Sequence, residues 1–170
     1  EFLTCVNRVF CQGESKPVLD RFYRQFTGIG SRYDRLFFEK KRLLAETELV
    51  GDIDNLAQTL LTVFEAMGEQ SLTPESLRDA LKELMIAFPV YRSYISEQGR
   101  SEADVHYICE AVGRVKAGLD EQTAQSSDFL AALAFLEKVL LLDETTLSPA
   151  VKALRLQFIM RFQQFTGPLT

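Results

Sequence analysis

Residues 36–67, LFFEKKRLLAETELVGDIDNLAQTLLTVFEAM, contain the apolar positions of the longest helical pattern in the chain, which runs from about Ser31 to Met67. Its apolar residues keep mostly to one side of a helix, as the spacing of an amphipathic α-helix requires. Uninterrupted from near residue 31, such a helix would be about 50 Å long at ~1.5 Å per residue. Gly51 is the expected kink or break, because glycine costs roughly 1 kcal/mol relative to alanine inside a helix. A helix of this length is typical of the spine of a bundle.

Helix start and stop signals on both sides of this segment predict further helices. Before it, residues 16–26 form a short amphipathic pattern that ends at Gly28, since glycine accepts the left-handed conformation found at helix ends. After it, Thr73-Pro74 begins a helix, and Pro89 ends it because proline disfavours helical geometry in the preceding residue. Further helices are predicted from Ser101 to Val115, from Asp128 to Leu142 and from Ser148 to Phe165.

These segments together predict an all-α fold of about six helices with short connections, in a bundle-like arrangement. Residues 90–95 are aromatic and β-branched with some alternation, and they predict at most a short extended segment. Strands and helices do not alternate along the chain, so a parallel sheet is not expected. Residues 1–170 are interpreted as a single helical region, and a subdivision into 1–95 and 96–170 stays open.

Composition excludes several classes of protein. The hydrophobic fraction of 46% and the charged fraction of 25% are those of an ordinary globular domain. The net charge of -5, without a basic face, argues against nucleic acid, since phosphate binding needs clustered lysine and arginine. The most apolar run, residues 129–142, contains Glu137 and Lys138 and is shorter than the ~20 residues of a membrane span. We therefore expect neither nucleic acid nor a membrane as a partner.

Cysteine and histidine usage gives no sign of a cofactor. An odd set of cysteines, Cys5, Cys11 and Cys109, favours reduced thiols in a cytoplasmic protein, with a Cys5–Cys11 disulfide as the alternative. There is one histidine and no C-x-x-C, so no zinc site is predicted. Nucleotide-binding glycine patterns are also absent. We therefore predict no metal and no cofactor.

The candidates for catalysis have simpler structural interpretations. His106 and Cys109 lie three residues apart and could share a helix face, but Cys–His catalysis needs a third group to orient the pair. Glycoside chemistry needs two carboxylates in differing environments across a sugar. Pairs such as Asp52 and Asp54, at their spacing on a helix, are usually solvated surface charge.

Two groups of polar and aromatic residues are candidates for binding. Tyr91, Arg92 and Tyr94 place an arginine between tyrosines, which can stack on and hydrogen-bond a sugar or another polar ligand. On residue types alone, a structural ion pair with aromatic packing is the favoured alternative. Arg161 and Gln163 pose a similar choice between lining a cleft and anchoring chain ends.

Two motifs resemble segments of the malto-oligosyltrehalose synthases. Phe88-Pro-Val-Tyr-Arg-Ser-Tyr94 resembles the family's FPVYRTY segment, and Arg161-Phe-Gln-Gln-Phe-Thr-Gly-Pro168 resembles its RFQQxTGP. Weaker similarities occur in family order at 22–28, 39–48 and 54–57, so the resemblance spans nearly the whole chain.

The resemblance implies a (β/α)8-barrel enzyme of the α-amylase type with large helical insertions. Such enzymes convert the reducing-end α-1,4 linkage of a malto-oligosaccharide into an α,α-1,1 linkage, which leaves a terminal trehalose unit. The implied mechanism uses a carboxylate nucleophile, a glycosyl-enzyme intermediate and a carboxylic acid/base. The released glucose must re-attack before water does, so the site must be closed. The family's catalytic motifs are absent here, so no catalytic residue is carried over.

By this resemblance, the chain is expected to be an internal helical fragment of a bacterial, cytoplasmic malto-oligosyltrehalose synthase. It would be inactive alone, cap the barrel and help to exclude water. Its partners would be a malto-oligosaccharide and the catalytic barrel, and a broad apolar face toward that barrel predicts self-association of the isolated chain. The residues expected to face the cleft are Tyr91, Arg92 and Tyr94, followed by Arg161 and Gln163.

Two other classes of function stay open. A free-standing helical domain for protein–protein interaction would bind its partner through an exposed apolar groove on an otherwise polar surface. A small helical enzyme that uses His106 is the third option.

Overall fold

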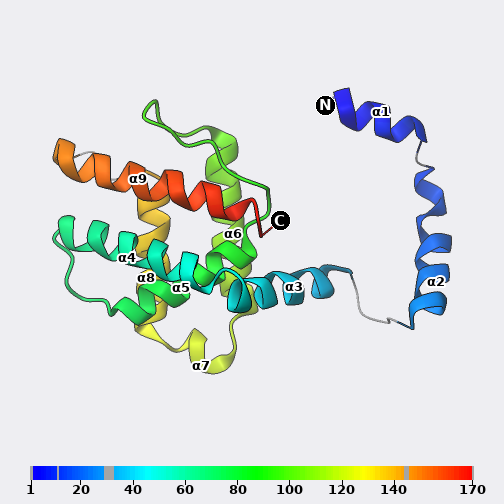
Figure 1. The fold of residues 1–170 in the computed structure, drawn as a ribbon, viewed down its shortest axis with the longest axis horizontal. Helices are drawn as coiled ribbons and strands as arrows, with labels where there is room; N and C mark the ends of the chain where they lie inside the picture. Colours follow the sequence, from blue (N-terminus) through cyan, green and yellow to red (C-terminus); the bar gives the residue numbers. More distant parts are fainter. Residues whose placement is uncertain (1, 11, 29–32, 144–145, 170) are drawn as a thin grey trace. The chain divides into compact units, whose positions relative to one another are not determined.

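The computed structural model describes residues 2–10, 12–28, 33–143 and 146–169, and the fold is all-α (Figure 1). In this part of the chain there is no β-strand, and an isolated bridge joins Ser96 to Gly99. The elements are, in order, α1 (Phe2–Phe10), the 310 helix η1 (Gly13–Ser15), α2 (Lys16–Thr27), α3 (Tyr33–Thr47), α4 (Val50–Ala66), α5 (Pro74–Ala87), α6 (Glu102–Gly118), α7 (Glu121–Ala124), α8 (Ser127–Leu140) and α9 (Pro149–Thr166). Contacts between Cα atoms divide the chain into two compact units, Glu1–Phe37 and Phe38–Thr170.

The prediction of about six helices is too low. Helix α1 and the short α7 were not predicted, and the pattern over residues 36–67 forms two helices, α3 and α4, instead of one. The break falls at residues 48–49, just before Gly51, and the amide of Leu49 bonds to the carbonyl of Leu44 at 3.1 Å. Gly51 instead lies in the first turn of α4, where backbone N–H groups lack a partner within the helix.

In the unit Glu1–Phe37, helix α2 is amphipathic but its apolar side chains are exposed. The helix ends as predicted at Gly28, whose φ of 68° is left-handed. No residue of α2 is buried. The rings of Phe22 and Phe26 stack at 6.2 Å between centroids, yet they are 65% and 82% exposed. The periodicity therefore predicts the helix correctly. It does not show whether another element buries the apolar face of that helix.

The hydrophobic core lies in the unit Phe38–Thr170. Helix α5 packs against α4, α6 and α8, while α9 packs against α4 and α8. In Figure 1, the axes of α4, α5 and α9 are roughly aligned, with α4 running opposite to α5 and α9, and α6 and α8 cross them. The fully buried side chains come from all five of these helices and include Leu60, Leu77, Leu81, Leu84, Ile108, Leu133, Leu136, Phe158 and Phe162.

Side-chain caps fix where the helices of this unit begin. The Thr73 hydroxyl accepts the Ser76 amide at 3.1 Å, with Pro74 in the first turn where its missing N–H costs nothing. Ser101 and Asp104 form a capping box at the start of α6. Ser148 caps α9 in the same way as Thr73 caps α5. These three starts confirm the boundaries predicted from the sequence.

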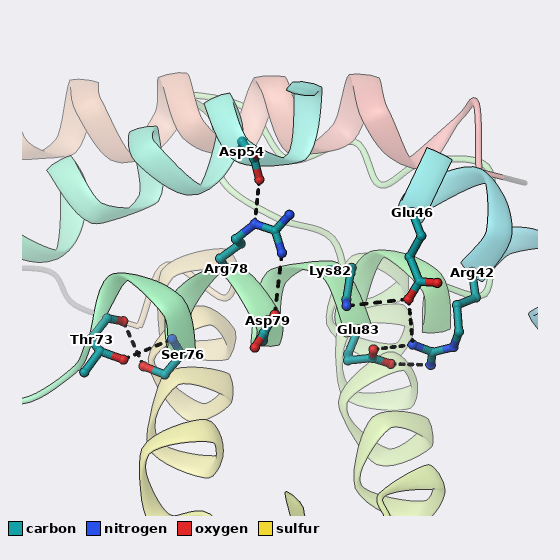
Figure 2. A network of polar contacts seen from close by, with 9 residues as sticks. All are labelled: Arg42, Glu46, Asp54, Thr73, Ser76, Arg78, Asp79, Lys82 and Glu83. Atoms are coloured by element: carbon teal, nitrogen blue, oxygen red, sulfur yellow. Dashed lines mark hydrogen bonds and ion pairs between the residues drawn. The ribbon is translucent and has the colours of Figure 1, made fainter. Parts of the chain in front are cut away.

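Charged side chains join α3, α4 and α5 on the outside of the core (Figure 2). Arg42 of α3 donates two hydrogen bonds to Glu83 of α5, at 2.6 and 2.7 Å. These hydrogen bonds raise the pKa of Arg42 above its usual value. Arg78 of α5 binds Asp54 of α4. The carboxylate of Asp54 is thus part of an ion pair, as Figure 2 shows.

No helix in the described ranges is long and apolar enough to cross a membrane. Cys5 and Cys109 are free and exposed, and Cys11 lies outside the described residues.

Candidate functional site

The segment that connects α5 to α6, residues 88–101, contains the first of the two motifs. Pro89 prevents α5 from continuing, and the following residues form neither helix nor strand up to the bridge at Ser96. Ser93 and Ile95 are buried, each 1% exposed. Tyr91 and Tyr94 are 62% and 72% exposed. The segment therefore presents its tyrosines to solvent while it is anchored through the residues between and after them.

Gln163 of α9 provides the main anchor of this segment. Its Oε1 accepts hydrogen bonds from the backbone N–H of Ile95 at 2.7 Å and from the Ser93 hydroxyl at 3.1 Å. Its Nε2 donates to the carbonyl of Ile95 at 3.1 Å. The residue is 1% exposed. Gln163 thus replaces the strand pairing that an isolated extended segment lacks, and it is too buried in this structure to contact a ligand.

The end of α9 fixes the other side of the segment. The Thr166 hydroxyl donates to the carbonyl of Tyr91 at 3.0 Å. A Cβ added to Gly167 would lie 2.9 Å from Cζ of Tyr91, so the phenol ring rests directly on this glycine. The rings of Phe88 and Phe162 meet edge to face at 5.4 Å. The two motifs of the sequence therefore pack against each other.

Asp104 holds the same segment from the start of α6. Its Oδ1 accepts the backbone N–H of Tyr94 at 2.8 Å, and its Oδ2 accepts the amide and hydroxyl of Ser101. Burial alone would raise the pKa of Asp104, but the hydrogen bonds from Ser101 and Tyr94 outweigh it and lower the pKa below the usual value. The carboxylate is thus ionised and structural, with both oxygens in use.

Lys41 of α3 closes the end of α5 where the segment begins. Its Nζ donates to the carbonyl of Phe88 at 3.0 Å. Burial, together with the nearby positive charge of Arg114, lowers the pKa of Lys41 from 10.5 to about 8. The hydrogen bond from Lys41 gives a partner to the carbonyl group at the end of α5.

The exposed part of the segment is an aromatic and cationic surface. The guanidinium of Arg92 lies 5.0 Å from the centroid of the Tyr94 ring, within the range of a cation–π contact. The Nε of Arg92 is buried, and it has no hydrogen-bond partner among the described residues. Rings of this kind stack on the apolar faces of sugars, and a guanidinium can donate to their hydroxyl groups.

The structure separates the candidate residues of the two motifs. Tyr91 and Tyr94 are exposed and Arg92 lies partly buried beside the Tyr94 ring, while Gln163 is buried. Arg161 instead lines a groove between α4 and α9. Thr166 and Gly167 are not among the residues predicted from the sequence, although both lie in the second motif. The sequence feature that could have indicated them is a threonine followed by a glycine at the predicted end of a helix. The threonine hydroxyl can donate a hydrogen bond, and the glycine leaves room for another side chain.

The two remaining candidates, His106 and Cys109, are exposed side chains of α6. His106 is exposed and lies 3.8 Å from the carboxylate of Glu110 on the next turn of α6. Within the described ranges, no group of three or more histidine, cysteine, aspartate or glutamate side chains is arranged to hold a metal ion.

Comparisons of this chain with protein-family models, with curated proteins and with solved structures find no match.

Proposed function

We propose that this chain is the helical region of a bacterial, cytoplasmic malto-oligosyltrehalose synthase and that its 91–94 segment forms part of the sugar-binding wall. The observation that carries the proposal is the contact between the two motifs. Gln163 and Thr166 of the second motif hold the backbone of the first, through Ser93, Ile95 and the carbonyl of Tyr91. Because one motif holds the other in place, an enzyme that uses the first motif would also need the second.

The surface that results has the chemistry of a sugar wall. Tyr91 and Tyr94 are held by their backbones, so their rings are available for stacking with little loss of conformational entropy. Arg92 adds hydrogen-bond donors whose charge is fixed at physiological pH. In this proposal the wall orients the glucose unit that is released and turned, and it excludes water while the carboxylates of the barrel carry out the glycosyl transfer.

The test is to read the source gene on both sides of this segment and to express its whole reading frame with maltohexaose as substrate. We expect barrel strands and the catalytic carboxylates in frame. We also expect loss of reducing ends, because an α,α-1,1 linkage uses both anomeric carbons. Stop codons that bound this segment, or a product that keeps its reducing ends, would contradict the proposal.

Variants of the same expressed protein locate the wall. Arg92→Ala and Tyr94→Ala are expected to lower kcat/KM about tenfold each, equivalent to about 1.4 kcal/mol of transition-state binding. Gln125→Ala changes an exposed side chain outside both motifs and is the control. Equal activity in all three variants would remove the segment from the sugar site.

A second candidate, a helical protein–protein interaction domain, is favoured by the exposed apolar face of α2. This face consists of Val18, Leu19, Phe22, Tyr23 and Phe26. Either a barrel or a separate protein could cover it, and an uncovered face predicts self-association. Sedimentation of the chain with Phe22→Ser and Phe26→Ser tests this: a shift to monomer supports association through α2, and an unchanged mass contradicts it.

A further inference from the structure

A groove about 520 Å³ in volume runs between α4 and α9, away from the 91–94 segment. This volume falls within the roughly 300–1,000 Å³ of small-molecule sites. Its α4 side includes Asp52, Asn55 and Gln58, and its α9 side includes Gln157, Arg161 and Gln164. On α9 these three residues are spaced i, i+4 and i+7, so they follow one face of the helix.

None of these six side chains forms a hydrogen bond or an ion pair with another residue in the described ranges. On the other side of α4, by contrast, the side chain of Asp54 does have a protein partner, because it accepts a hydrogen bond from Arg78 of α5 (Figure 2). Polar groups that converge on one groove without protein partners leave their hydrogen-bonding capacity to solvent or to a ligand.

The composition of the groove defines the ligand it fits. One carboxylate and one guanidinium leave it nearly neutral, whereas a phosphate would need an excess of cations and a metal ion several acidic oxygens. Each of the four amides offers both a donor and an acceptor. Leu56, Leu154 and Phe165 add an apolar lining. Paired donors and acceptors beside apolar surface match the hydroxyl groups and C–H faces of a sugar.

We propose that the α4–α9 groove binds a neutral polyhydroxylated ligand, namely a short oligosaccharide. The amides of Gln157 and Gln164 bind its hydroxyl groups from one side, and Asn55 and Gln58 bind from the other. This inference does not rest on the function proposed for the 91–94 segment, because it uses other residues on another face of α9.

The experiment is a titration of the full 170-residue chain with maltopentaose and, separately, with cellopentaose, followed by ¹H–¹⁵N NMR. We expect saturable shifts of the side-chain amides of Asn55, Gln58, Gln157 and Gln164 with at least one of the two. Gln157→Ala/Gln164→Ala is expected to weaken binding at least about tenfold, for the loss of two amide partners. Both substitutions are at exposed helical positions that alanine suits, and circular dichroism checks the fold. Gln125→Ala is the matched control and is expected to bind as the parent chain does.

Any of three outcomes in these titrations would overturn the inference, and a fourth, described after them, would also bear on the proposed function. They are no saturable shift with either sugar, equal affinity of the double variant and the control, or stronger binding of inorganic phosphate than of both sugars. Shifts confined to Tyr91 and Tyr94, abolished by Tyr94→Ala but not by the groove variant, would overturn it while supporting the proposed function. Shifts in the groove alone would support this inference without supporting that function.

Discussion

Helices α2 and α5 carry similar apolar stripes, but only one of them is buried. Leu19 of α2 is 63% exposed, whereas Leu81 of α5 is 0% exposed because α4, α6 and α8 surround that helix. Both stripes predict a helix, and both helices form. The difference shows that periodicity determines which face is apolar, while a partner in space determines what that face contributes to stability.

The largest expected effect comes from making the same substitution in both helices. Leu81→Ala is expected to reduce the free energy of unfolding of Phe38–Thr170 by about 2–5 kcal/mol, because it removes buried apolar area and leaves a cavity. Leu19→Ala is expected to change it by less than about 0.5 kcal/mol. Urea denaturation of each variant measures both values. Equal losses would mean that the stripe of α2 is buried in solution.

Polar residues of α9 allow a second comparison of this kind. Gln163→Ala is expected to cost about 2–3 kcal/mol, because it leaves the N–H of the buried Ile95 without its acceptor. Gln164→Ala, at the exposed neighbouring position, is expected to be nearly neutral. Denaturation of the pair measures the difference. A neutral Gln163→Ala would show that the segment 91–95 is held by its other contacts.

The sequence predicts local features of this kind well and spatial ones poorly. The caps at Thr73, Ser101 and Ser148 were predictable because each depends on residues within one helical turn. The role of Gln163 was not, because its partners lie 68 and 70 residues away, and only the packing of α9 brings them together.

In the candidate site too, the sequence predicts which neighbouring residues belong together but not how residues on a helix are oriented. Tyr91, Arg92 and Tyr94 could be grouped from the sequence because they are neighbours along one short segment. The sequence also grouped Arg161 with Gln163, but a two-residue separation on a helix turns side chains by about 200°, from the 3.6-residue repeat. This rotation sends Arg161 to the groove with α4 and Gln163 to the buried side.

Neighbouring lysines of α3 extend the comparison to pH dependence. Lys41 is buried and Lys40 is exposed. The lowered pKa of Lys41, about 8, means that between pH 8 and about 10.5 the unfolded chain binds a proton that the folded chain has released. The free energy of unfolding should therefore rise with pH across this window, by about 3 kcal/mol at ~1.4 kcal/mol per pKa unit.

Lysine-to-methionine variants test whether Lys41 causes this rise in the free energy of unfolding with pH. Lys41→Met is expected to flatten the pH dependence between pH 8 and 10.5, and Lys40→Met to preserve it. Denaturation in urea at intervals of pH measures both. A parent chain whose stability is constant across the window would show that Lys41 keeps its proton when it is folded.

The smallest expected effect concerns two acids in the first turn of α6. Asp104 is buried and bonded to Ser101 and Tyr94, while Glu102 is exposed. Because folding lowers the pKa of Asp104, its contribution is complete above the unfolded pKa of about 3.9 and is lost as pH falls through the folded pKa. Asp104→Asn should cost about 1 kcal/mol at pH 7, as the loss of a cap does, and the cost should shrink in acid. Glu102→Gln should leave both the stability and its acid dependence nearly unchanged. Denaturation between pH 7 and pH 2 distinguishes the two variants. Equal pH profiles of stability for both would mean that the acid dependence comes from proximity to the helix terminus and not from the hydrogen bonds of Asp104.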